Sequence, residues 1–261
     1  MKNRTKRDIL FYATLGLSVI CILIFSLPDL KLSQDRMLHF LLSAIFPRLA
    51  VSLFLIVAML TSGYAHSLAF PLKGFAKALL WSVPCFLVAV VNFPFSALIS
   101  GTATLKRLDL LWFFIAKCFS IGLMEELFFR GLALPVLLKK LNKHRHGVLL
   151  SVILSSAFFS CMHLLNLFMG ANVGATLLQL GYTFLIGCMF AVLFLKTDNL
   201  WLCVLIHTLF NVGGVIVTEL GMGKFQDTVF WILTAIAGVI CTLHILLSLR
   251  SVIQKHTDGN N

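Results

Sequence analysis

Residues 108–138 read LDLLWFFIAKCFSIGLMEELFFRGLALPVLL, a stretch long and apolar enough to cross a membrane as a helix. Glu125, Glu126 and Arg130 lie in its middle. A charged side chain at the centre of a bilayer costs about 2.5 to 3.5 kcal/mol, so three of them this close together must be paired, hydrated or functional. On a helix Glu126 and Arg130 are four residues apart and can form an ion pair. Glu125 lies about 100° round the helix axis and has no assigned partner.

The composition of the whole chain indicates an integral membrane protein. Its 261 residues are 59% hydrophobic and only 12% charged, whereas a soluble domain carries about 25% charged residues. The net charge of +11 would suggest a nucleic-acid partner in a soluble protein. Here the basic residues gather in short loops and at the chain ends, which the positive-inside rule explains better. We therefore expect contact with membrane lipid and no nucleic-acid partner.

Apolar segments recur along the chain and predict an all-α, polytopic membrane bundle of about eight transmembrane helices. The connecting segments are short, so we expect a single integral membrane domain over residues 1–261. The distribution of Lys and Arg predicts that both termini lie in the cytoplasm. The expected spans are 9–27, 37–61, 75–95, 108–138, 147–170, 174–195, 200–218 and 229–249.

Two further spans carry polar residues that do not belong in lipid. Phe159 and His163 are four residues apart in F-S-C-M-H, and His207 and Asn211 are four apart in H-T-L-F-N, so each pair shares a helix face. A single histidine within the membrane is more often a structural residue bonded to a neighbouring helix. Several polar groups on three spans are best satisfied by one another. We therefore expect them to meet the glutamates of the 108–138 span.

The depth of these residues gives a partial check at about 1.5 Å per helical residue. Glu125 and His163 lie at similar depths, about 21 Å and 24 Å from the expected inner ends of their helices. His207 lies only about 12 Å beyond Asn199. Either the helix of His207 begins inside the membrane or the site is tilted.

Two chemistries are open to this set of residues. In one, a glutamate acts as a general base towards water, the histidines polarise a carbonyl or hold the oxyanion, and the Asn211 amide donates to it. In the other, Glu125, His163 and His207 form a two-His, one-carboxylate set with an open fourth position, as in a catalytic zinc site. Both lead to hydrolysis of an amide bond inside the membrane.

Three motifs on separate spans resemble the CPBP intramembrane proteases. This group includes the type II CAAX prenyl endopeptidases, the bacterial Abi proteins and bacteriocin self-immunity proteins. The resemblance covers about residues 108–218, which we expect to be the catalytic core; the first three spans and the last are supported only by helix count. The motifs are E-E-x-x-x-R at 125–130, F-x-x-x-H at 159–163 and H-x-x-x-N at 207–211.

The resemblance implies a role for each motif residue. Glu125 is the base that activates water, Glu126 and Arg130 orient it, and His163 is the second catalytic group.

His207 and Asn211 are implied to stabilise the oxyanion. Members of the group have been described both as metalloproteases and as metal-independent glutamate proteases, so a zinc ion held by the three possible ligands stays open.

The resemblance favours an intramembrane endopeptidase that cleaves a membrane-associated or lipid-modified, CAAX-like protein or peptide. The alternatives are a non-catalytic immunity or scaffold protein of the same fold and a proton-coupled transporter, although no internal repeat supports a transporter. We expect a bacterial plasma membrane location from the distribution of the family. We interpret Lys117 as a snorkelling or ion-paired residue and Arg48, beside Pro47, as a charge that seeks the surface.

Overall fold

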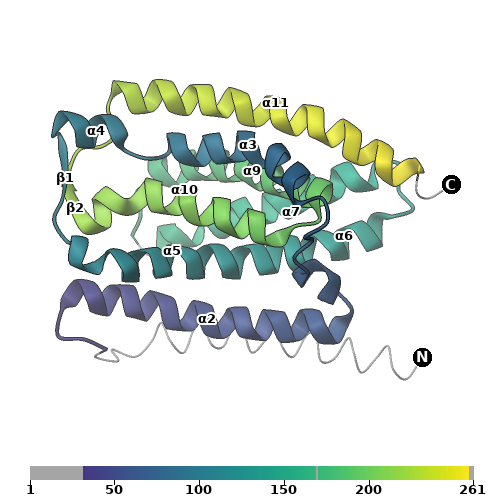
Figure 1. The fold of residues 1–261 in the computed structure, drawn as a ribbon, viewed down its shortest axis with the longest axis horizontal. Coiled ribbons are helices and arrows are strands. Elements are labelled where there is room, and N and C mark those ends of the chain that lie inside the picture. Colours follow the sequence, from purple (N-terminus) through teal and green to yellow (C-terminus); the bar gives the residue numbers. More distant parts are fainter. Residues whose placement is uncertain (1–31, 169, 259–261) are drawn as a thin grey trace.

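The structure is a computed structural model that describes residues 32–168 and 170–258. Most of the described chain is helical and forms one bundle of roughly aligned helices (Figure 1). The first half contains α2 (Arg36–Ser62), η1 (Ala65–Leu68), α3 (Phe75–Val91), α4 (Phe95–Ser100), β1 (Ala103–Leu105), η2 (Leu108–Leu110) and α5 (Leu111–Glu126). The second half contains η3 (Leu127–Ala133), α6 (Leu134–Leu141), α7 (Gly147–Met162), α8 (Leu165–Phe168), α9 (Val173–Thr197), α10 (Leu200–Leu220), β2 (Gly221–Gly223) and α11 (Thr228–Asp258).

The predicted all-α membrane bundle is confirmed. Within the described ranges, six helical stretches are long and apolar enough to cross a membrane. A further apolar stretch runs from α5 through η3 into α6. The first expected span, 9–27, lies outside the described residues. The expected span 147–170 is shorter as a continuous helix, because α7 ends at Met162 and the four-residue helix α8 follows it.

The stretch 108–138 is not a regular α-helix throughout. It starts as α5 and changes at Leu127 into a π-helix, η3, before α6 resumes the α-helical pattern. Arg130 lies in the π-helical turn. Such turns are rare, and many occur at functional sites. The unusual turn therefore lies directly after the two glutamates.

Capping residues account for several helix boundaries. Asp35 accepts hydrogen bonds from the backbone amides of Met37 and Leu38 at the start of α2. Asn172 and Asn199 cap α9 and α10 in the same way. Such side chains satisfy amide groups that have no partner inside a helix. Each of the three helices thus begins where the sequence supplies a suitable cap.

The helix α10 begins inside the bundle. Its cap residue Asn199 and its first residue Leu200 are both fully buried. In Figure 1, α10 stops short of the end of the bundle that α11 reaches. Other parts of the bundle therefore cover the start of this helix.

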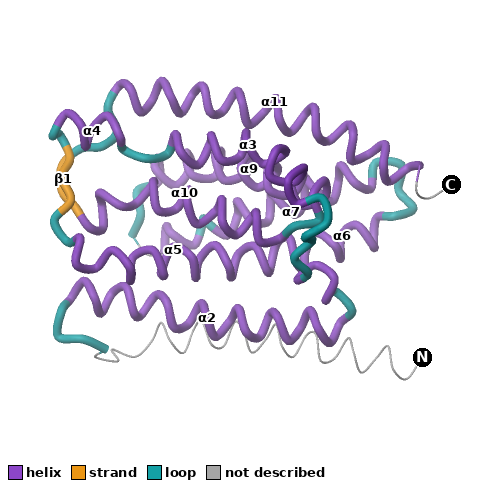
Figure 2. The backbone as a smooth tube through the Cα atoms, in the orientation of Figure 1, coloured by secondary structure: helices purple, strands orange, loops and turns teal. Residues whose placement is uncertain are grey.

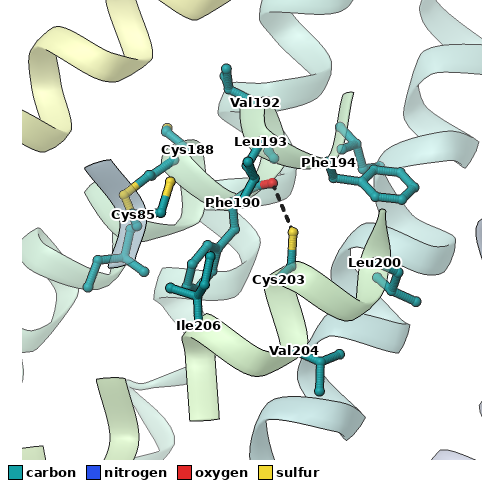
Figure 3. Packing of buried hydrophobic residues seen from close by; sticks show 14 of the residues in the cluster. Cys85, Cys188, Phe190, Val192, Leu193, Phe194, Leu200, Cys203, Val204 and Ile206 are labelled. Carbon is teal, nitrogen blue, oxygen red and sulfur yellow. Dashed lines mark hydrogen bonds between the residues drawn. The ribbon is translucent and has the colours of Figure 1, made fainter. Parts of the chain in front are cut away.

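The main core lies where α3, α5, α9 and α10 meet. Figure 3 shows Phe190 of α9 among side chains from neighbouring helices, with Cys203 of α10 donating its thiol proton to the Phe190 carbonyl at 3.7 Å. Phe190 is fully buried. The face of α9 that carries Phe190 is therefore closely packed in the main core.

A two-stranded antiparallel sheet joins two distant parts of the chain, and the sequence analysis did not predict it. β1 precedes α5, whereas β2 directly follows α10, and Thr104 pairs with Met222 (Figure 2). The strands have three residues each, too short to show an alternating pattern. A side chain at Gly221 would place its Cβ 2.3 Å from the Thr104 carbonyl oxygen, so only glycine fits this approach.

Candidate active site

The helices α5 and α10 approach closely at Gly122. A Cβ atom there would lie 3.2 Å from the Thr208 hydroxyl and 3.3 Å from the Thr208 backbone nitrogen. The absence of a side chain lets the two backbones come together. Glu126, one turn after Gly122, then meets His207, the residue before Thr208. The local contact of the two helices thus brings the first and third motifs together.

Four side chains form a continuous line of polar contacts. Arg130 donates from Nη1 to Glu126 Oε1 at 2.8 Å, and His207 Nδ1 lies 2.7 Å from the same oxygen. On the other side of the ring, His207 Nε2 lies 3.4 Å from Glu125 Oε2. The line therefore runs from Arg130 through Glu126 and His207 to Glu125. It gives Glu125 the partner that the sequence left unassigned.

The two glutamates differ sharply in exposure. The Glu126 side chain is completely buried, whereas the Glu125 side chain is 22% exposed. A buried carboxylate needs an opposite charge and hydrogen bonds. Arg130 and His207 supply them at Oε1, whereas Oε2 has no hydrogen-bond partner among the described residues. Glu125 is the member of the line that water or a substrate can reach.

Aromatic rings enclose the buried part of this line. The Arg130 guanidinium lies 4.9 Å from the Phe159 ring centroid and 5.3 Å from that of Phe190. His207 packs against the same two rings, at centroid distances of 5.9 Å and 5.4 Å. The aromatic walls exclude water and strengthen the electrostatic interactions between the charged groups. They also receive the guanidinium through cation–π contacts.

His163 reaches this group through Phe159 and has no direct contact with the glutamates in the described structure. Its ring packs edge-on against Phe159 at 5.2 Å, and its Nδ1 lies 3.1 Å from the Phe159 carbonyl oxygen. A carbonyl only accepts, so Nδ1 donates and carries the proton. In the neutral ring Nε2 is then left as an acceptor. Phe159 therefore lies between the rings of His163 and His207.

Asn211 lies apart from the line of charges. No hydrogen bond joins its side chain to the other candidate residues within the described ranges. It lines a cavity of about 310 Å³ bounded by α3, α9, α10 and α11. Asn92 and Gln179 line the same cavity. Asn92 also donates to the Phe210 carbonyl at 2.7 Å and thereby fixes the α10 backbone beside Asn211.

The sequence left open a zinc ion held by Glu125, His163 and His207, and the described structure does not bring these three side chains together. Among residues 32–168 and 170–258, no group of three His, Cys, Asp or Glu side chains is placed to hold a metal ion. Glu126 engages Nδ1 of His207, and Glu125 lies beside its Nε2. The chemistry proposed below therefore includes no step through a metal.

A second buried ion pair links α5 and α10, and the sequence analysis identified only one of its members. Lys117 pairs with Glu219, and both side chains are largely buried. The Lys117 ammonium also lies 5.0 Å from the Phe40 ring of α2. The interpretation of Lys117 as an ion-paired residue is thus correct. Glu219 was missed because the expected span ended at residue 218, whereas α10 continues to Leu220.

A comparison with protein families finds a match for the part of the chain that carries the three motifs. The family model described as type II CAAX prenyl endopeptidase Rce1-like matches residues 107–213. This segment is therefore similar to that family. It contains all three motifs and every element from η2 to the middle of α10. Comparisons with curated proteins and with solved structures found no match.

The family supports intramembrane protease activity over the scaffold and transporter alternatives. Together with the apolar helices, it supports an integral membrane protein that contains a segment similar to the CAAX prenyl endopeptidases.

Proposed function

We propose that this protein is an intramembrane endopeptidase in which Glu125 activates the water that attacks a peptide bond. The observation that carries the proposal is the partly exposed Glu125 carboxylate, which lies 3.4 Å from the ring of His207 at the end of a buried line of charges. The substrate is a membrane-associated, lipid-modified protein or peptide of the CAAX type. The family match supports this substrate class.

The buried part of the line orients His207. Because Glu126 accepts from His207 Nδ1, the ring is held with Nε2 towards Glu125. Arg130 holds Glu126 in turn and also donates to the Gly187 carbonyl at 3.1 Å. The resemblance implies that Glu126 and Arg130 orient Glu125. The pair acts on the base through the histidine.

The reaction then needs one proton acceptor and one oxyanion site. Glu125 removes a proton from water, the hydroxide adds to the carbonyl carbon, and the proton passes to the leaving amine as the C–N bond breaks. The imidazolium forms of His207 and His163, in which Nε2 as well as Nδ1 carries a proton, stabilise the oxyanion by hydrogen bonding. Asn211 lines the cavity between α3, α9, α10 and α11. Its amide donates a hydrogen bond to the oxyanion once a bound substrate extends from this cavity to the glutamates.

We propose residues 108–218 as the catalytic core within a single membrane domain. The basic segment that follows α6, with Lys139, Lys140, Lys143 and Arg145, supports a cytoplasmic position for this end of the bundle. Both termini then lie in the cytoplasm, and the membrane is a bacterial plasma membrane.

The decisive test is cleavage of a prenylated CAAX peptide by purified protein in detergent. Glu125→Gln keeps the shape of the side chain and removes the base, so we expect turnover to fall by about 10²-fold to 10⁴-fold. Asp198→Asn is the matched control, because Asp198 is an αL residue at the end of α9 and asparagine tolerates that conformation. It should leave turnover unchanged.

A chelator arm separates the two chemistries. Cleavage that survives chelation and disappears in Glu125→Gln supports the glutamate base. Loss on chelation with recovery on adding zinc would show that the three-ligand site forms in solution and would overturn the metal-free reaction. Full activity of Glu125→Gln would refute the proposed function.

A further inference from the structure

The helices α3, α9 and α11 bring three polar residues to one end of the bundle. Lys77 lies in the first turn of α3, Lys196 in the last turn of α9, and Ser251 near the end of α11. These helices pack against one another (Figure 1). Ile253 of α11 lines a small cavity together with His146 of the basic segment after α6. The three polar residues therefore lie at the end of the bundle that the proposed topology assigns to the cytoplasm.

The Lys196 ammonium is held by contacts that leave its charge uncompensated. Its Nζ lies 3.1 Å from the centroid of the Trp81 ring and donates to Ser251 Oγ at 3.1 Å. The Ser251 hydroxyl donates its own proton to the Ser248 carbonyl, so its oxygen is the acceptor towards Lys196. The Lys196 side chain is partly buried. The ring and the hydroxyl thus orient the ammonium without neutralising it.

Lys77 adds a second positive charge beside the first. Lys77 and Trp81 are four residues apart on α3 and share a helix face, so Lys77 lies one turn from the ring that carries Lys196. The charges of Lys77 and Lys196 are close enough to repel each other. No carboxylate of the described residues lies within 4.0 Å of either ammonium. Two like charges that different helices bring together favour the binding of an anion.

The surface beside the two lysines is apolar and exposed. Leu80, three residues after Lys77, and Leu247, four residues before Ser251, both have exposed side chains. Each lies about 4.5 to 6 Å further along its helix towards the middle of the membrane. Trp81 is also exposed in part, and tryptophan is typical of the boundary between headgroups and acyl chains. The lysines thus lie at headgroup level and the leucines at the level of the acyl chains.

We propose that Lys77 and Lys196 bind the phosphate of an anionic phospholipid in the cytoplasmic leaflet. Basic pockets between transmembrane helices on this side of a membrane bind anionic headgroups. Each lysine donates to a phosphate oxygen, and the acyl chains lie along Leu80 and Leu247. The choice of leaflet rests on the proposed topology, whereas the site itself is independent of the proposed protease chemistry.

The test measures lipid binding to the full-length protein in neutral detergent by native mass spectrometry. The probes are phosphatidylglycerol and phosphatidylcholine with the same acyl chains, which differ in net charge. Two lysines at an anionic headgroup predict that phosphatidylglycerol binds about tenfold to thirtyfold tighter. Lys77→Gln and Lys196→Gln should each reduce this preference by at least about threefold, and the double variant should abolish it. Lys196→Arg keeps the charge and should keep most of the preference.

Arg250→Gln is the matched control. Arg250 is an exposed cation two residues after the buried Ser248, which places it on nearly the opposite side of α11. The variant removes one positive charge from the same end of the bundle and should keep the full preference for phosphatidylglycerol. Lys77→Gln keeps the test decisive if Lys196→Gln does not fold, because Lys77 is exposed and its loss leaves the Trp81 contact intact.

Competition with inorganic phosphate separates a lipid site from a site for a soluble anion. We expect a tenfold excess of phosphate over phosphatidylglycerol to leave the bound lipid in place, because phosphate makes no contact with the leucines. Displacement at equal concentration would assign the lysines to a soluble phosphate and overturn the proposal. Equal binding of the two lipids by the natural protein would also overturn it. A fall in preference as large in Arg250→Gln as in Lys77→Gln would show a general effect of net charge and contradict a defined site.

Discussion

Breaking the buried ion pair between Arg130 and Glu126 should destabilise the protein strongly. Arg130 is 1% exposed and Glu126 is fully buried, so Arg130→Met leaves a carboxylate with no cation. Removing one partner of such a pair costs about 3 to 5 kcal/mol. Methionine keeps much of the apolar contact with the surrounding rings, so the loss reports mainly on charge. The ratio of folded to unfolded protein should fall by at least about a hundredfold.

The assay is unfolding in mixed micelles, followed by circular dichroism as the fraction of denaturing detergent rises. The double variant Arg130→Met/Glu126→Gln removes both charges and should recover much of the lost stability. Arg107→Met is the matched control, since Arg107 makes two ion pairs but is 35% exposed. It should change stability little. The reasoning is refuted if Arg130→Met behaves like the control, or if the double variant is no more stable than the single one.

Two other predictions concern packing and pH. Gly187→Ala would place Cβ 3.0 Å from a side-chain atom of α7 and should destabilise the bundle by about 1 to 3 kcal/mol, whereas Gly181→Ala on the same helix meets no atom within 4 Å and should be neutral or stabilising in the same unfolding assay. A hydrogen bond from Arg107 lowers the pKa of Asp35 to about 2 from its usual 3.8. Because this folded pKa is depressed, the charge of Asp35 should contribute stability above about pH 4 and lose it as the pH falls towards 2. Asp35→Asn keeps the helix cap, so its stability difference from the natural protein should be constant at neutral pH and vanish near pH 2; a constant difference throughout would contradict the pairing.

Much of the fold could be predicted from composition and apolar run length. Helix boundaries agree with the expected spans within a few residues where a cap or glycine marks them, as at Gly147 and Asn199. The early end of α7 was not predictable by hydropathy, because the residues after Met162 stay apolar after the helix has ended. The π-helix was also missed, because its sequence is that of an ordinary apolar helix.

Part of the candidate site could also be predicted from the sequence, and part could not. Four residues spaced along two spans could be expected to meet because buried polar groups need partners, and the contacts of Glu126 with Arg130 and His207 fit that argument. The sequence did not reveal which glutamate is exposed, since that depends on how α2 and α10 cover α5. The position of Arg48 on the face of α2 that carries the buried Ile45 and Ser52 was also not evident from the sequence.

The small sheet fixes the alignment of the two helices that carry the site. β1 leads into α5 and β2 ends α10, and three residue pairs set the register between them. A slip of α10 along α5 by one residue would carry His207 about 1.5 Å past Glu125, which is enough to break their contact. The six residues of the sheet, at one end of the bundle, thus help to set the distance between His207 and Glu125. Their exchange for a flexible loop would disturb the catalytic geometry without touching any catalytic side chain.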